Sequence, residues 1–248
     1  MPRKGGDRRR RKERPIRYLI YAVFFALLVT LGATVHLYSA GQLSQSSYLV
    51  YASIAQSMLF SFVVFAYILA RRGTLGQAIG ELGLSRRSWG FRCILYGIGL
   101  FAAILLLEII LSVFQAVTGV QLPTNVSQLF TGLPFYFLVF SVVVVPVNEE
   151  VLFRGFLVPK IGATLLSALR RPTKRDYTYA MWAGIIISAL IFGALHYLSY
   201  SSISELVAAL VFGILSGYVR MKKNSLYPSI IAHMLVNFLG LLLLAVLV

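Results

Sequence analysis

Residues 134–151 read PFYFLVFSVVVVPVNEEV, an apolar stretch that ends in two glutamates. A helix of this length can cross the hydrocarbon core of a bilayer, which is about 30 Å thick. Similar stretches recur on both sides of it along the chain. Seven are expected to span the membrane: Tyr18–Leu37, Tyr48–Ala70, Ile94–Val117, Pro134–Val151, Tyr179–Leu198, Ile203–Val219 and Leu226–Val248. The predicted fold class is all-α, a polytopic bundle of about seven transmembrane helices.

The composition is that of a membrane protein. Of the 248 residues, 58% are hydrophobic and 12% are charged, whereas a soluble domain carries about 25% charged residues. The mean hydropathy is +0.81. The single cysteine, Cys93, excludes an intramolecular disulfide and a cysteine-based metal site.

The positive charges lie in alternate connections between the predicted spans. The net charge of +15 would suggest a nucleic-acid partner in a soluble protein, but here the charges mark one side of a membrane. The 23 Lys and Arg residues fall into four groups: nine within 3–17, five within 71–92, six within 154–175 and three within 220–223. By the positive-inside rule the N-terminus is cytoplasmic and the C-terminus extracytoplasmic, in a multi-pass protein of the cell membrane.

The chain divides into three expected parts. Residues 1–17 are polybasic and predicted to be a disordered cytoplasmic tail that lies against anionic lipid headgroups. Residues 18–133 hold the N-terminal membrane helices, with an amphipathic segment over Leu75–Trp89 that suits a short helix on the cytoplasmic face. Residues 134–248 form the core that carries most of the intramembrane polar residues. A cleavable signal peptide is the competing interpretation of the first span, which is longer than the usual apolar region of such peptides.

Polar residues inside the spans need a partner or a function, because each costs about 2.5 to 3.5 kcal/mol on insertion. Pro146 is expected to kink the fourth span just before Glu149 and Glu150. On a helix, Glu150 and Arg154 are four residues apart and can pair. Glu149 points about 100° away and is expected to face a cavity. The alternative is that the two glutamates merely end a span at the headgroups.

Three further polar residues lie in later spans. His196 follows Phe192 by one helical turn, and His233 and Asn237 share one face of the last span because they are four residues apart. Interfacial packing and polar contacts between helices are the structural alternatives. Glu108 is deep in the third span, and the sequence names no partner for it.

The strings EEVLFR, FGALH and HMLVN, read in order on three spans, resemble the EExxxR, FxxxH and HxxxN/B motifs of the CPBP family. This family, also called Abi, joins CAAX prenyl endopeptidases with bacteriocin-processing and immunity proteins. The resemblance covers roughly 135–237 and implies a catalytic core over 134–248. The site residues that it implies are Glu149, Glu150, Arg154, His196, His233 and Asn237.

The expected function is an intramembrane endopeptidase that cuts a membrane-bound or amphipathic peptide. Glu149 would activate water with His196, and His233 and Asn237 would donate to the oxyanion. Alternatively, Glu149, His196 and His233 would bind Zn²⁺ as a His₂Glu site. A non-catalytic immunity or scaffold protein of the same family is the alternative function.

One expectation concerns helix geometry. If the fourth span ends at Val151, Glu149 lies near the inner membrane face and His196 near the outer face. Straight upright helices would then separate the two side chains by roughly 18 Å. Strong tilt or a bend at Pro146 is therefore expected, together with a wet cavity in which both histidine rings lie within about 8 Å of the Glu149 carboxylate.

Overall fold

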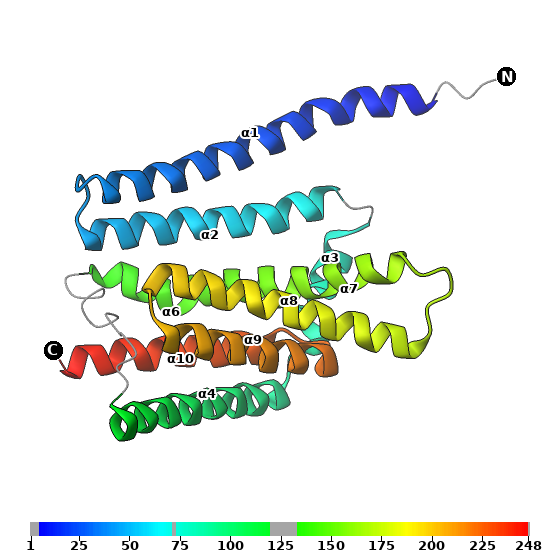
Figure 1. The fold of residues 1–248 in the computed structure, drawn as a ribbon. Coiled ribbons are helices and arrows are strands. Elements are labelled where there is room, and N and C mark those ends of the chain that lie inside the picture. The colour runs from blue at the N-terminus through cyan, green and yellow to red at the C-terminus, as the bar shows by residue number, and fades with distance from the viewer. Residues whose placement is uncertain (1–4, 71–72, 120–132, 248) are drawn as a thin grey trace. The chain divides into compact units, whose positions relative to one another are not determined.

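The computed structural model describes residues 5–70, 73–119 and 133–247, and all regular secondary structure within them is helical. The predicted all-α class is confirmed. The chain forms two compact units, Met1–Arg71 and Arg72–Val248. The first contains α1 (Gly5–Ser39) and α2 (Gln45–Ala70). The second contains α3 (Leu75–Glu81), η1 (Arg86–Ser88), α4 (Phe91–Thr118), α6 (Phe135–Glu150), η2 (Val151–Leu157), α7 (Val158–Ser167), α8 (Lys174–Tyr200), α9 (Ile203–Lys223) and α10 (Tyr227–Leu247) (Figure 1).

Within the described residues, six helical segments are long and apolar enough to cross a membrane. They correspond to the first six predicted spans and are Ile20–Ser39, Gln45–Ala70, Phe91–Thr118, Phe135–Ser167, Lys174–Tyr200 and Ile203–Lys223. The seventh predicted span is α10, whose apolar part, Tyr227–Leu243, is shorter than the other six. The sidedness of the two termini stays a prediction, and most of the connection between the third and fourth predicted spans lies outside the described residues.

The first unit is a helical hairpin. Its connection is closed by the rings of Tyr38 and Tyr48, which stack with their centroids 4.3 Å apart. Helix α1 begins at Gly5, so residues 5–17 are helical where the sequence analysis expects disorder. Arg, Lys and Glu are good helix formers, and a basic segment can continue a helix that an adjoining apolar span has already nucleated.

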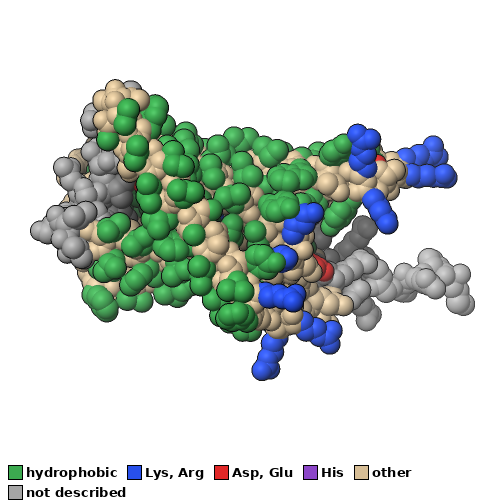
Figure 2. Space-filling model, turned by 90° about the horizontal axis from the view of Figure 1, so that it is seen from below, with side chains coloured by type: hydrophobic (Ala, Val, Ile, Leu, Met, Phe, Trp, Pro, Cys, Tyr) green, Lys and Arg blue, Asp and Glu red, His purple; other side chains and the backbone are tan. Residues whose placement is uncertain are grey.

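The expected amphipathic segment of the second unit contains α3 and η1, and its backbone is fastened to the α9–α10 connection. Arg220 Nη2 donates to the carbonyl of Glu81 at 2.7 Å. The Leu226 N–H donates to the carbonyl of Gly83 at 2.9 Å. Gly83 has φ +83°, and a Cβ there would lie 2.7 Å from Arg220 Nε, so a side chain would collide with the arginine. Lys and Arg side chains gather toward this end of the unit in Figure 2, and hydrophobic side chains cover most of the visible remainder.

Glycines bring the helices of the second unit into close contact. A Cβ at Gly213 of α9 would lie 2.7 Å from Ala189 of α8, and one at Gly97 of α4 would lie 2.8 Å from Ile231 of α10. Helix α4 therefore packs with the helices of the core. The two compact units divide after Arg71, and the expected catalytic core over 134–248 stays a prediction.

The segment that begins as α6 does not end near Val151. It continues as a π-helical turn, η2, and then as α7, so one helical segment runs from Phe135 to Ser167. Arg154, which the sequence analysis assigned to a connection, therefore lies inside the bundle with 1% of its surface exposed. The fourth span is longer than predicted, and Glu149 lies near its middle.

This extension explains how the structure avoids the expected 18 Å separation. Ser188 Oγ of α8 donates to the carbonyl of Phe153 at 3.1 Å, which fixes the register of the two antiparallel segments. Because the two segments are antiparallel, one helical turn from this contact in the same direction leads to Glu149 on α6 and to Phe192 on α8. His196 follows one turn later, about 6 Å farther along the helix. The longer helix thus brings Glu149 and His196 toward the same level of the bundle, and the expected tilt of the helices in the membrane stays a prediction.

Candidate active site

Glu150 and Arg154 form a fully buried ion pair at the junction of α6 and η2. Arg154 Nη1 donates to Glu150 Oε1 at 2.8 Å, and the two side chains are 1% and 0% exposed. The guanidinium also lies over the Phe192 ring, 4.1 Å from its centroid, and 5.1 Å from that of Phe212. The predicted pairing is present, and aromatic rings take the place of water around the cation.

His233 of α10 faces both glutamates. Its Nδ1 donates to Glu150 Oε1 at 3.0 Å, and its Nε2 lies 3.7 Å from Glu149 Oε2. The ring is edge-on to Phe212, with the centroids 5.1 Å apart. His233 is 5% exposed and Glu149 is 6% exposed. Because a carboxylate can only accept, Glu150 fixes the proton on Nδ1 and leaves Nε2 toward Glu149.

His196 of α8 joins this cluster through Phe192. Its Nδ1 donates to the Phe192 carbonyl at 3.0 Å, and its ring lies 4.3 Å from the Phe192 ring, centroid to centroid. The Phe192 and His233 rings also meet at right angles, with their centroids 5.9 Å apart. One phenyl ring thus contacts both histidines, and the Nε2 of His196 is left without a backbone partner.

Asn237 lies one turn beyond His233 on α10. Its Nδ2 donates to the Ser141 carbonyl of α6 at 2.9 Å. Pro146 has no N–H to donate to the carbonyl of Val142, so the helix is loosened there. The bond from Asn237 joins α6 just before this point. One of the two amide hydrogens of Asn237 is therefore used to fasten α10 to α6.

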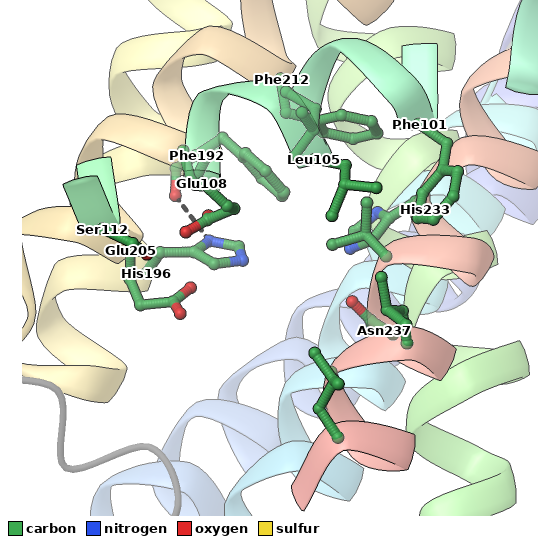
Figure 3. A pocket seen from close by; sticks show the side chains of 17 residues that line it. Phe101, Leu105, Glu108, Ser112, Phe192, His196, Glu205, Phe212, His233 and Asn237 are labelled. Atoms are coloured by element: carbon green, nitrogen blue, oxygen red, sulfur yellow. Dashed lines mark hydrogen bonds between the residues drawn. The ribbon is translucent and has the colours of Figure 1, made fainter. Parts of the chain in front are cut away.

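A cavity of about 380 Å³ lies beside these residues, between helices α4, α8, α9 and α10 (Figure 3). His196, His233 and Asn237 line it, and Glu149 reaches this region through His233. Glu108 and Glu205 also line it. Glu108 was noted in the sequence without a partner, and Glu205 was not predicted. Glu205 lies in the first turn of α9, where an acidic residue is a common feature of helix starts.

The expected zinc site does not fit this arrangement. The described residues contain no group of three or more His, Cys, Asp and Glu side chains arranged to hold a metal ion. Both ring nitrogens of His233 face carboxylates, and Nδ1 of His196 is bonded to its own helix. As arranged, these side chains do not form a His₂Glu metal site.

The residues of the three sequence motifs thus lie in one region of the structure: two glutamates, two histidines and an asparagine. Residues 131–239 match the family model described as Type II CAAX prenyl endopeptidase Rce1-like. The match confirms the resemblance to the CPBP family that the motifs indicated. The matched residues include all six predicted site residues, and the family model is described as an endopeptidase, which supports a peptidase in general terms.

The chain is also similar to a curated protein of Escherichia coli, named "Uncharacterized 24.3 kDa protein". The two are 30% identical over 100 residues, which is 40% of this chain and 40% of that protein. No solved structure matches the chain. Together with the six apolar helices, the Rce1-like match indicates a multi-pass membrane protein.

Proposed function

We propose that the protein is an intramembrane endopeptidase whose general base is Glu149. The observation that carries this proposal is the buried contact of Glu149 with His233, beside a cavity that His196 and Asn237 also line. A carboxylate held away from water is a stronger base than an exposed one, and a cavity between helices can hold a peptide segment that the surrounding lipid would not.

In the proposed reaction a water molecule attacks the scissile carbonyl while Glu149 accepts its proton. The new C–O bond gives a tetrahedral oxyanion, which collapses as the C–N bond breaks. The proton then passes from Glu149, directly or through Nε2 of His196, to the leaving amine. The second N–H of Asn237 lies on the other side of the cavity and is a proposed oxyanion donor. Nε2 of His233 is the other proposed donor, in the imidazolium form that carries a proton on both ring nitrogens.

The proposed substrate is a membrane-bound or amphipathic peptide. The cavity is lined largely by apolar side chains, among them Phe101, Leu105 and Leu239. Peptides with a prenylated C-terminus are the first to be tested, because the matched family model is described as a prenyl endopeptidase.

The test is cleavage by the full chain reconstituted in lipid vesicles. Prenylated and unmodified amphipathic peptides are incubated with wild-type protein and the Glu149→Gln variant, and the products are identified by mass spectrometry. We expect Glu149→Gln to lower turnover by about 10² to 10⁴-fold, the usual contribution of a general base. Glu81→Gln, which changes an exposed carboxylate on α3, is the control and should cleave as wild type. Equal cleavage by wild type and Glu149→Gln would contradict the proposal.

A further inference from the structure

Two carboxyl groups that the proposed chemistry does not use also line the cavity. Glu108 comes from the middle of α4 and Glu205 from the first turn of α9, and both are partly buried. They gather with His196 at one side of the cavity, whereas His233 and Asn237 lie at the other (Figure 3). The two carboxyls are close enough to interact electrostatically with each other.

No positive charge from the described residues balances this pair. The residues that line the cavity include neither Lys nor Arg. Arg154, a buried cation of the same unit, is paired with Glu150. Two like charges in a poorly solvated space repel each other and are each costly to hold in a membrane. A ligand that brings a positive charge would remove both costs.

The cavity also has the size and lining for such a ligand. Its volume of about 380 Å³ lies within the range of sites that bind small molecules or side chains. Apolar side chains such as Leu105 and Leu243 line the cavity between its polar groups and would pack against an aliphatic stem. His233, which lines the opposite side of the cavity, has both ring nitrogens turned toward Glu149 and Glu150, so they are not available to Glu108 and Glu205.

We propose that Glu108 and Glu205 form a subsite that binds a Lys or Arg side chain of the peptide substrate. The subsite determines specificity, because it lies in the same cavity as the proposed catalytic residues and would select peptides with a basic residue near the cleaved bond. This inference rests on the proposed endopeptidase function for its role in catalysis, but cation binding can be measured without cleavage.

Binding is measured with the Glu149→Gln protein in lipid nanodiscs, so that no probe is consumed. Two fluorescent amphipathic peptides are compared that differ only in one Lys replaced by the uncharged norleucine. We expect the Lys peptide to bind at least about tenfold more tightly, since a poorly solvated charge pair contributes more than an exposed one. Adding Glu108→Gln or Glu205→Gln should each reduce this ratio, and both together should bring it to about one. Adding Glu81→Gln should leave it unchanged.

Equal affinity for the two peptides in the parent protein would overturn the inference, as would a Lys preference that survives in the double variant. Thermal unfolding identifies any variant that does not fold, and the remaining single variant then decides.

Cleavage by protein with Glu149 intact separates the two proposals. Cleavage without a Lys preference would leave the endopeptidase and reject the subsite, whereas a Lys preference in binding without cleavage of either peptide would reject the endopeptidase and keep the subsite.

Discussion

At the scale of single residues, one oxygen of Glu150 accepts from two helices at once. Arg154 Nη1 and His233 Nδ1 both donate to Oε1, at 2.8 and 3.0 Å. Glu150 thereby connects η2 to α10 and holds the His233 ring with its other nitrogen toward Glu149. Two adjacent glutamates thus have different tasks: Glu150 positions a histidine, and Glu149 is the proposed base.

Glu150→Gln should therefore destabilise the fold, whereas Glu149→Gln should leave it nearly unchanged. Removing the charge of Glu150 leaves Arg154 buried without its counter-ion, which costs about 3 to 5 kcal/mol. Thermal unfolding in detergent micelles measures the difference as a lower melting temperature for Glu150→Gln. Equal melting temperatures for the two variants would show that the ion pair contributes little to stability.

The two histidines should also differ when each is replaced by alanine. His233→Ala removes a ring bonded to the buried ion pair and should lower the melting temperature, whereas His196→Ala removes a ring at the cavity wall and should lower mainly activity. Metal content, measured on the same purified samples, tests the His₂Glu alternative. Stoichiometric zinc in the wild type that is lost equally from both variants would establish a zinc centre and show that the ligands rearrange to bind it.

Sequence spacing was enough to predict the Glu150–Arg154 pair, because residues four apart on a helix share a face. Spacing could not predict that His233 would bond to Glu150, since that contact joins segments 83 residues apart. Glu205 was missed for a different reason. It follows the capping residue Ser202, and an acidic residue there is explained by helix capping and the helix dipole alone.

At the scale of helices, the length of the fourth span was the main error. Charged residues usually end a span at the headgroups, so Glu149 and Glu150 suggested an end near Val151. The helix instead continues to Ser167 because the charges are paired within the bundle. The π-helical turn that follows Glu150 leaves no comparable signal in the sequence. Gly213 and Gly217 in α9, spaced four residues apart, lie where α9 packs closely against α8.

Gly213→Val should destabilise the bundle, because its Cβ would come within 2.7 Å of Ala189 on α8. Overpacking of this kind costs about 1 to 3 kcal/mol. Gly99→Val on α4 is the matched control, since nothing lies within 4 Å of a Cβ there. Melting temperatures of both variants check the prediction, which fails if Gly99→Val is as destabilising as Gly213→Val.

At the scale of the whole molecule, the segregation of Lys and Arg predicts sidedness. In the second unit, the basic connections α3–α4, α7–α8 and α9–α10 lie toward one end of the helices (Figure 1). This grouping follows from an alternation already visible in the sequence. Which end faces the cytoplasm depends on membrane insertion and cannot be derived from helix packing.

A reporter fused after Val248 should be extracytoplasmic, and one inserted between Arg171 and Arg175 should be cytoplasmic. Paired fluorescent and periplasm-active reporters measure both positions in intact cells. Signals on the same side of the membrane would show that the number of spans between the two positions is even, and the seven-span topology would have to be revised.

The position of His233 on α10 has a consequence for biosynthesis. Helices enter the membrane in the order of their synthesis, so α6 and its two glutamates are in place before the histidine that contacts them has been made. Until α10 inserts, Glu150 has only Arg154 as a partner, and the cavity lacks the wall that α10 provides. The nascent protein is therefore unable to form its proposed site until α10 is inserted. The proposed proteolytic activity would thus be withheld from neighbouring chains at the translocon during assembly.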